Sequence, residues 1–331
     1  MNGETPGGGM SRRTFLGATA VATALTLPAS AARFAGNSLR ARGPLVDVNV
    51  NLFRWPTRRL PCDETTALVA RLRRYGVTQA WAGSFEGLLQ KDLGGVNRRL
   101  ASECRERGRG VLLPFGSINP KLPDWEEELR RCVEVYRMPG IRLNPDYHGY
   151  KLDDPDFVRL LRRASESRIL VQLAMTMEDE RTVHPRLRLD AIDLAALTEP
   201  VAQTPGLRLV LLNSLRTWRA EPLRRLLSAG DVYVEIAMLV GVGGVGRLLG
   251  EVPMERVLFA SYAPFYYFES AWLKLQESPL DEQQLGGIRE KNARRLLAET
   301  ALPPSRGAAR QGSRAPAGRL HLPVPWLVLG P

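Results

Sequence analysis

The segment Val46-Asp47-Val48-Asn49-Val50-Asn51-Leu52 has the composition of a buried strand that ends in polar side chains. Similar short apolar runs recur at 77–81, 110–116, 140–143, 169–174, 207–212, 232–236 and 257–260. Between them the sequence predicts helices at 65–75, 96–107, 124–136, 154–167, 191–203, 221–229, 245–250, 269–276 and 281–297. Sustained alternation of strands and helices predicts a parallel sheet, and eight units favour a closed (β/α)8 barrel over an open sheet.

The net charge of +11 is concentrated at the two ends of the chain. Residues 1–42 carry five arginines against one acid, and 303–331 carry four arginines and no acid. The part between them has an ordinary charge, which argues against a nucleic-acid partner. We therefore expect a single barrel domain at 43–300, with a signal and linker at 1–42 and a low-complexity, disordered tail at 301–331.

The N-terminal segment has the order of parts found in an export signal. Ser11-Arg12-Arg13-Thr14-Phe15-Leu16-Gly17 is a twin-arginine core, an apolar stretch follows to Leu27, and Ala29-Ser30-Ala31 is an A-x-A cleavage pattern. This order predicts export of a folded protein to the periplasm or the extracellular space. Membrane contact is expected only through the twin-arginine machinery, because the apolar run is too short to span.

Two further patterns carry little chemistry. The chain has three cysteines, Cys62, Cys104 and Cys132, and no C-x-x-C spacing, so neither a zinc ribbon nor a disulfide framework is indicated. Residues 241–246 match G-x-G-x-x-G, but they lie late in the chain, and the next strand ends without an acid for a ribose. We therefore expect a glycine-rich loop there, and no cofactor.

Several strand ends resemble the amidohydrolase superfamily, in particular its amidohydrolase-related (family 2) branch. That branch shows D-x-H-x-H after strand one, a His after strand six and G-[ST]-D-x-P after strand eight, where this chain has Asp47-Val48-Asn49-Val50-Asn51, Asn213 and Ser261-Tyr262-Ala263-Pro264. The segment Ile288–Leu297 is similar to the closing helix of the family. The resemblance implies a TIM barrel and metal-assisted hydrolysis, or sometimes decarboxylation, of small molecules.

The chain departs from the pattern of the family at every recognisable metal ligand. Asn49, Asn51 and Asn213 offer neutral amides, Tyr262 offers a phenol, and the strand-five ligand falls near Gln172. None is a good zinc ligand. We expect no metal, and two explanations stay open: a site adapted to bind a substrate through polar side chains, or drift after loss of activity.

Other candidates follow the predicted strand ends. Arg142 is placed to clamp a carboxylate or phosphate, or to pair with an acid of the protein. His148 and His184 are the candidate general bases, with Asp179 or Glu178 as the residue that orients His184, although a charged loop of this kind is usually only solvated. Glu235, on strand seven, is expected either to point into the site or to pair with a barrel arginine.

Two functions remain open at this stage. In the first, the barrel hydrolyses a small anionic molecule without a metal, using His184, Asp179 and His148 on a substrate held by the polar strand-end residues. In the second, the barrel is a non-catalytic binding protein exported to the cell envelope. Either way the expected partner is a small molecule, and a homo-oligomer is left open.

Overall fold

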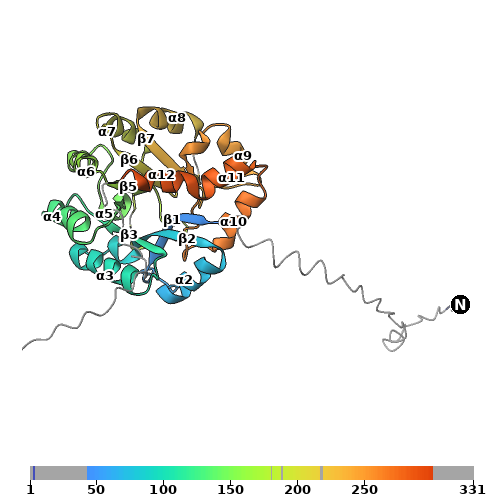
Figure 1. The fold of residues 1–331 in the computed structure, drawn as a ribbon, viewed down its shortest axis with the longest axis horizontal. Coiled ribbons are helices and arrows are strands. Elements are labelled where there is room, and N and C mark those ends of the chain that lie inside the picture. The colour runs from blue at the N-terminus through green and yellow to red at the C-terminus, as the bar shows by residue number, and fades with distance from the viewer. Residues whose placement is uncertain (1–2, 4–42, 180, 188, 217–218, 301–331) are drawn as a thin grey trace, which may run out of the picture.

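The structure is a computed structural model that describes residues 3, 43–179, 181–187, 189–216 and 219–300. Its centre is an eight-stranded parallel sheet in the order β1 to β8, rolled into a barrel (Figure 1). The strands are β1 (Leu45–Leu52), β2 (Val77–Ser84), β3 (Leu112–Ser117), β4 (Gly140–Leu143), β5 (Leu170–Ala174), β6 (Arg208–Leu212), β7 (Asp231–Glu235) and β8 (Val257–Leu258). The predicted (β/α)8 barrel is confirmed; the predicted signal and tail lie outside the described residues.

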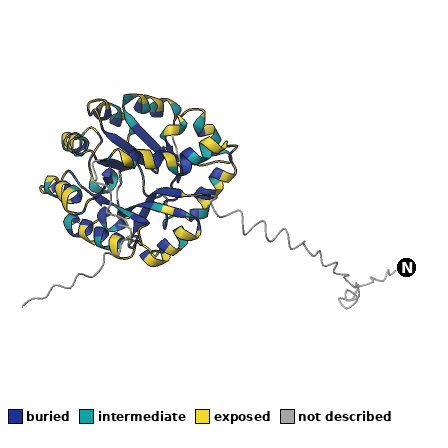
Figure 2. Ribbon diagram, viewed as in Figure 1, coloured by how far each residue is buried: buried dark blue, intermediate teal, exposed yellow. Residues whose placement is uncertain are grey.

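The helices surround the strands, and their outer faces are exposed while the strands are buried (Figure 2). They are α2 (Thr65–Arg74), α3 (Leu93–Glu106), α4 (Trp125–Arg130), α5 (Pro145–His148), α6 (Pro155–Glu166), α7 (Thr198–Ala202), α8 (Ala220–Ala229), α9 (Gly244–Leu249), α10 (Phe268–Gln276), α11 (Glu282–Gly286) and α12 (Asn292–Ala298). Shorter 3-10 turns are η1 (Phe85–Leu88), η3 (Leu194–Leu197) and η4 (Met254–Arg256), and π-helical turns are η2 (Arg131–Val135) and η5 (Gly287–Lys291). Within the described ranges, no helix has the length and apolar character needed to cross a membrane.

The barrel closes where the chain after β8 runs beside β1. Val48 N donates to Phe259 O at 3.1 Å, and Asn51 N donates to Ala263 O at 2.9 Å. Val50 and Ala263 form a parallel bridge at the same place. The first strand is thus paired on both edges, which leaves no open sheet edge there.

Two apolar clusters hold the barrel together. One lies between the strands and the surrounding helices. The other fills the barrel interior, with Val48, Trp81, Phe115 and Val210 among its members. Helix α12 contributes Leu296 to the inner cluster, and Arg208 Nη1, at the start of β6, donates to the Leu296 carbonyl at 2.9 Å. Because α12 covers the amino ends of the strands, any site must open at their carboxyl ends.

Local sequence signals set most helix ends. Helix α6 begins where Asp154 accepts from Asp156 N at 2.9 Å with Pro155 in the first turn, and α2 is followed by Gly76, whose φ is +83°. The helix predicted at 191–203 was wrong in its first residues, because Asp193 accepts from Ala195 N and starts a 3-10 turn there. The segment predicted as one helix at 124–136 changes to a π turn at Arg131.

Candidate functional site

Seven of the predicted site residues converge inside the barrel near the carboxyl ends of its strands. They come from β1, β4, β5 and β7 and from the residues that follow β6 and β8, and none is more than 2% exposed: Asn49, Asn51, Arg142, Gln172, Asn213, Glu235 and Tyr262. Parallel strands present their carboxyl ends at one face of a barrel, which explains the convergence. Their burial means that they contact one another before they contact any ligand.

Arg142 lies in the middle of this group and uses four of its N–H bonds on the protein. Its Nε donates to Gln172 Oε1 at 2.9 Å, and its Nη1 donates to Asn51 Oδ1 at 2.8 Å and to Val50 O at 2.9 Å. Its Nη2 donates to Trp81 O at 3.2 Å. All four acceptors are neutral, so Arg142 brings a net positive charge into the barrel interior.

Gly83 on β2 makes room for this guanidinium. A Cβ at Gly83 would lie 2.6 Å from Arg142 Nη1 and 2.8 Å from its Cδ. Burial lowers the pKa of Arg142 to about 10, and the nearby Glu235 and Asp47 carboxyl groups favour its charged form. The guanidinium is therefore protonated at neutral pH. The sequence analysis did not single out Gly83, because its role depends on a side chain from another strand.

Glu235 organises a second network at the ends of β6 and β7. Its Oε1 accepts from Asn213 N at 2.6 Å and from Asn49 Nδ2 at 3.3 Å, and its Oε2 accepts from Ala237 N. Asn49 Nδ2 also donates to Asn213 Oδ1 at 3.0 Å. Burial raises the pKa of Glu235, whereas these hydrogen bonds favour its ionised form. The carboxyl group thus fixes the chain after β6, where Asn213 has a left-handed φ of +57°.

Asp47 is a buried acid that the sequence analysis passed over. Its Oδ1 accepts from Ser261 N at 3.0 Å and from Asn49 N at 3.2 Å, and its Oδ2 accepts from Ser261 Oγ at 2.5 Å. Burial raises the pKa of Asp47 to about 7. The signal was present in the sequence, because an acid in the middle of an apolar strand must find buried partners.

Aromatic rings lie over the barrel interior and form what we call the aromatic cover: Trp55, Phe85, Tyr147, Tyr262 and Phe265. The Trp55 ring centroid lies 4.8 Å from that of Phe265, 5.0 Å from Phe85 and 6.4 Å from Tyr147, and the Tyr262 centroid lies 5.0 Å from Phe265. Trp55 is 3% exposed. These contacts separate the polar networks of the barrel interior from the loops outside.

Tyr262 anchors the aromatic cover to the loop after β5. Its hydroxyl donates to Met177 O at 2.6 Å, and its φ is +57°. Burial raises its pKa well above the ordinary value for tyrosine, so the phenol is neutral. The hydroxyl already donates its proton to the protein. A role of Tyr262 in binding a substrate stays a prediction.

The two candidate imidazoles lie in different surroundings. His148 ends α5, where its Nε2 donates to Gly87 O at 2.8 Å, and its Nδ1 is buried without a hydrogen-bond partner in the described structure. Burial lowers the pKa of His148, so its ring is neutral. His184 is exposed on the loop after β5, and its Nδ1 accepts from Arg186 N at 3.3 Å.

Asp179 contacts two guanidinium groups instead of the His184 ring. Its Oδ2 lies 2.5 Å from Arg216 Nη2 and 2.7 Å from Arg181 Nη2. The hydrogen bonds from Arg181 lower the pKa of Asp179, and the charge of Arg216 adds to this effect. The structure therefore does not bring Asp179 and His184 together as an acid–base pair, and their catalytic roles stay predictions.

A cavity of about 970 Å³ opens between the loops that follow β5 and β6. We call it the β5–β6 cavity. Its wall contains residues predicted from the sequence, since Asn213, His184 and Glu178 line it. It also contains groups for which the sequence alone predicted no role: Asp146, Ser214 and Arg216. Burial raises the pKa of Asp146 to about 7. This cavity lies at the face of the barrel where enzymes of this architecture carry their sites.

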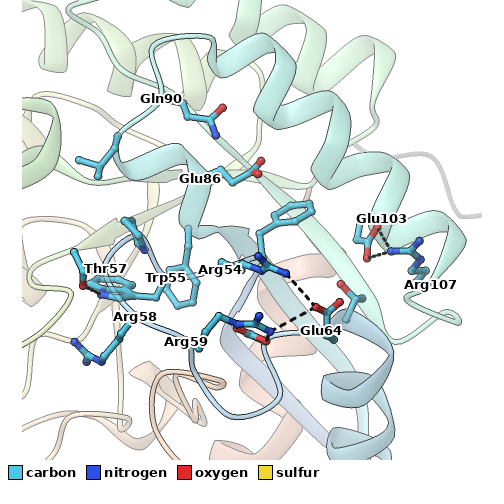
Figure 3. A pocket seen from close by; sticks show the side chains of 16 residues that line it. Arg54, Trp55, Thr57, Arg58, Arg59, Glu64, Glu86, Gln90, Glu103 and Arg107 are labelled. Carbon is cyan, nitrogen blue, oxygen red and sulfur yellow. Dashed lines mark hydrogen bonds and ion pairs between the residues drawn. The ribbon is translucent and has the colours of Figure 1, made fainter.

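A second cavity of about 690 Å³ lies between the loops after β1 and β2 (Figure 3). Most of its charged groups are paired with each other. Arg107 contacts Glu103 at 3.1 Å, and Arg59 contacts Glu64 at 3.7 Å (Figure 3). Arg59 also contacts Asp63 at 2.5 Å. Because these ion pairs are satisfied within the wall, this cavity is a weaker candidate for ligand binding than the β5–β6 cavity.

The comparison with protein families decides what kind of barrel this is. The sequence profile of the amidohydrolase family matches residues 55–298, from the loop after β1 to the end of α12. The chain belongs to the amidohydrolase family. The resemblance seen in the sequence is thereby confirmed for the family and the fold. A comparison with curated protein sequences found no match.

Solved structures share the fold of this chain at low sequence identity. The 2,6-dihydroxybenzoate decarboxylase from Rhizobium matches with a TM-score of 0.57 and 16% identity over 76% of this chain and 99% of that chain. The 5-carboxyvanillate decarboxylase from Sphingomonas paucimobilis matches with a TM-score of 0.57 and 12% identity over 78% and 99%. A dihydroxybenzoic acid decarboxylase from Polaromonas, solved with bound manganese, matches with a TM-score of 0.58 and 13% identity over 77% and 97%.

The residues of this family member do not fit the metal centre that the resemblance implies. Asn51 and Gln172 direct their side-chain oxygens at the Arg142 guanidinium, and a divalent cation among them would be repelled by its charge. Among the residues that the structure describes, no group of three or more His, Cys, Asp or Glu side chains could hold a metal ion.

Proposed function

We propose that this amidohydrolase-family protein binds a small organic molecule in the β5–β6 cavity and does not use metal-assisted hydrolysis. The observation that carries the proposal is the position of Arg142, whose guanidinium occupies the barrel interior and is bound by Asn51 and Gln172. The interior is closed by the protein's own side chains, so we place the ligand in the cavity of about 970 Å³, the larger of the two cavities described above.

A ligand screen tests this proposal directly. The purified protein would be titrated with a library of small amines, alcohols and carboxylic acids, and its melting temperature followed together with the amount of each compound. Benzoate-type acids belong in the library, because the related decarboxylases are named for aromatic acids. We expect at least one compound to raise the melting temperature without being consumed. A library without any stabilising compound, or turnover that requires added metal, would contradict the proposal.

Two tryptophan variants locate the bound compound. Ala191 is exposed at the rim of the β5–β6 cavity, so Ala191→Trp should fill the entrance and remove the stabilisation. Leu89 is 51% exposed and lines the other cavity, so Leu89→Trp is the matched control and should leave the stabilisation unchanged. The reverse result would move the ligand to the cavity of Figure 3.

Metal-independent hydrolysis is the second candidate function, and Asp146 is the observation that favours it. This carboxyl group lines the cavity, and burial raises its pKa to about 7, a value suited to a general acid or base near neutral pH. His184 lines the same cavity. If hydrolysis occurs there, His184→Ala should abolish it while the protein stays folded. Unchanged turnover in that variant would remove His184 from the mechanism.

We also propose export by the twin-arginine route, as the sequence of residues 11–31 predicts. That segment lies outside the described residues. Replacing Arg12 and Arg13 together with lysine should retain the full-length protein in the cytoplasm of an expressing bacterium. Unchanged appearance of a shortened chain in the periplasmic fraction would contradict this route.

A further inference from the structure

The buried end of the β5–β6 cavity contains a carboxylate oxygen that has no hydrogen-bond donor among the residues that the structure describes. Glu178 lines the cavity and is only 3% exposed. Its Oε2 accepts from Thr182 Oγ1 at 3.1 Å and from Arg58 Nη1 at 3.3 Å, but its Oε1 is buried without a partner among the described residues. Ser214 Oγ, also in the cavity wall, is likewise without a described partner, and as a hydroxyl it can either accept or donate. Because an unmet buried acceptor is costly, this end suits a ligand that donates hydrogen bonds.

The charges of the wall favour a cation over an anion. Four carboxyl groups face two guanidinium groups and one imidazole: Asp146, Glu178, Asp190 and Asp193 against Arg216, Arg219 and His184. Arg216 is bound at 2.5 Å to Asp179 and Glu178 at 3.3 Å to Arg58, and neither partner lines the wall. Apart from these two ion pairs, the described part of the wall has three carboxyl groups against one guanidinium and one imidazole: Asp146, Asp190 and Asp193 against Arg219 and His184. This excess of acidic groups favours positively charged ligands.

The rest of the wall is largely apolar, so it can contact an apolar part of the ligand in addition to its charged group. The apolar side chains come from the loop after β5 and the turn that starts η3: Met175, Met177, Leu187, Leu189, Ile192 and Leu194. A cavity of about 970 Å³ with this lining is of the size that holds a small organic molecule.

We propose that the β5–β6 cavity binds a small organic amine, with the ammonium group at Glu178 Oε1 and the apolar body along the methionine and leucine side chains. This proposal rests on the proposed function and names its ligand class. The sequence alone predicted an anionic ligand because of Arg142. Arg142 is not part of this cavity wall, so that expectation concerns the barrel interior and not this cavity.

Asp146 supplies a second carboxyl group for the same ammonium. Its Oδ1 accepts from Tyr147 N at 2.9 Å, and Asp146 is half-buried in the wall. An arriving cation favours the ionised carboxylate and so promotes loss of its proton. The same cavity thus offers a cation two carboxyl groups, from the loops after β4 and β5.

Three probes that share one body and differ in charge test the proposal: phenethylamine, 2-phenylethanol and 3-phenylpropanoate. Their affinities for the full chain would be measured by isothermal titration calorimetry. A hydrogen bond to a charged group corresponds to roughly tenfold or more in affinity, so we expect the amine to bind at least about tenfold more tightly than the alcohol and the acid. Glu178→Gln should remove that preference. Glu64→Gln, which changes an exposed acid of the other cavity, is the matched control and should preserve it.

Ala191→Trp gives a second test that leaves the buried carboxyl groups intact, and it should abolish binding of the amine. Equal or tighter binding of 3-phenylpropanoate, amine binding that survives Ala191→Trp, or no binding of any probe would overturn the amine assignment. The wider proposal of a binding function is decided separately, by the full library. If no amine binds but a carboxylic acid of the library stabilises the protein, the amine proposal is wrong and the binding function is supported.

Discussion

Arg142 Nη1 donates to Asn51 Oδ1 at 2.8 Å in the interior of the barrel, and Asn51 stands where the family pattern has a metal-binding histidine. The same guanidinium also contacts Gln172, near the position expected for the strand-five ligand, at 2.9 Å. The positively charged guanidinium of Arg142 thus lies among the side chains that stand at the positions of the family's metal ligands. The consequences for stability and binding can be measured.

Gly83→Ala tests the space reserved for Arg142. The new Cβ would lie 2.6 Å from Nη1, so the guanidinium must move and lose hydrogen bonds. We expect the free energy of unfolding to fall by about 2 kcal/mol, measured by urea denaturation. Gly246→Ala is the control, because its Cβ meets nothing nearer than 3.5 Å and alanine favours helix α9. Equal stability of the two variants would contradict the packing described here.

Arg142→Met removes the buried cation while keeping much of its length. The acceptors on Asn51, Gln172, Val50 and Trp81 would lose their donors, so the free energy of unfolding should fall by about 3 kcal/mol or more. Arg163→Met, at a surface ion pair with Glu166, is the matched control and should cost less than about 1 kcal/mol. If Arg142→Met lowers the free energy of unfolding by no more than Arg163→Met does, Arg142 contributes little to the stability of the barrel interior.

Asp47 predicts a dependence of stability on pH. Burial raises its pKa in the folded protein to about 7 from an ordinary value of 3.8, so the folded state holds the proton more tightly. Its stabilising contribution is therefore complete below the lower value and is lost as pH rises through the higher one, by up to roughly 4 kcal/mol. We expect the free energy of unfolding to fall from about pH 4 to about pH 7 and to level off above that.

Asp47→Asn should flatten this fall, since the amide carries no titrating proton and can still accept from Ser261 N and Asn49 N. Denaturation curves at several pH values would show the change in slope. Glu235 and Asp146 also have raised pKa values, so part of the fall should remain. A slope identical in the two proteins would mean that Asp47 does not titrate in this range.

The amine proposal predicts tighter binding at higher pH. Burial raises the pKa of Asp146 to about 7, and an ammonium is attracted to the ionised form. Its neighbours Tyr147, Tyr150 and Tyr262 stay neutral because burial raises their pKa values. Phenethylamine affinity should therefore rise by up to about tenfold between about pH 6 and about pH 8, and Asp146→Asn should remove the rise. A pH-independent affinity in the unchanged protein would contradict a role for Asp146.

Much of the fold followed from local pattern. The eight strands were visible as short apolar runs, and the start of α6 was visible in Asp154 and Pro155, because those signals act over a few residues. The one-turn helix α5 and the 3-10 turn η3 were missed. Both are short elements whose formation depends on contacts made by the rest of the barrel.

The sequence located the polar strand-end residues but not what they contact. Arg142 reaches across the barrel to Val50, and Glu235 binds the backbone of Asn213 on the neighbouring strand. Partners of this kind depend on strand register, which a single sequence does not reveal. The β5–β6 cavity was also hidden, because Asp146 and Ser214 meet in it only after the loops of β4 and β6 are in place.

Elemental analysis of the purified full-length chain, after dialysis first against zinc and manganese and then against metal-free buffer, tests the central claim most directly. The guanidinium of Arg142 among neutral amides predicts a metal content far below one ion per chain. One zinc or manganese ion retained per chain would contradict it, and would mean that the interior side chains rearrange to hold a metal.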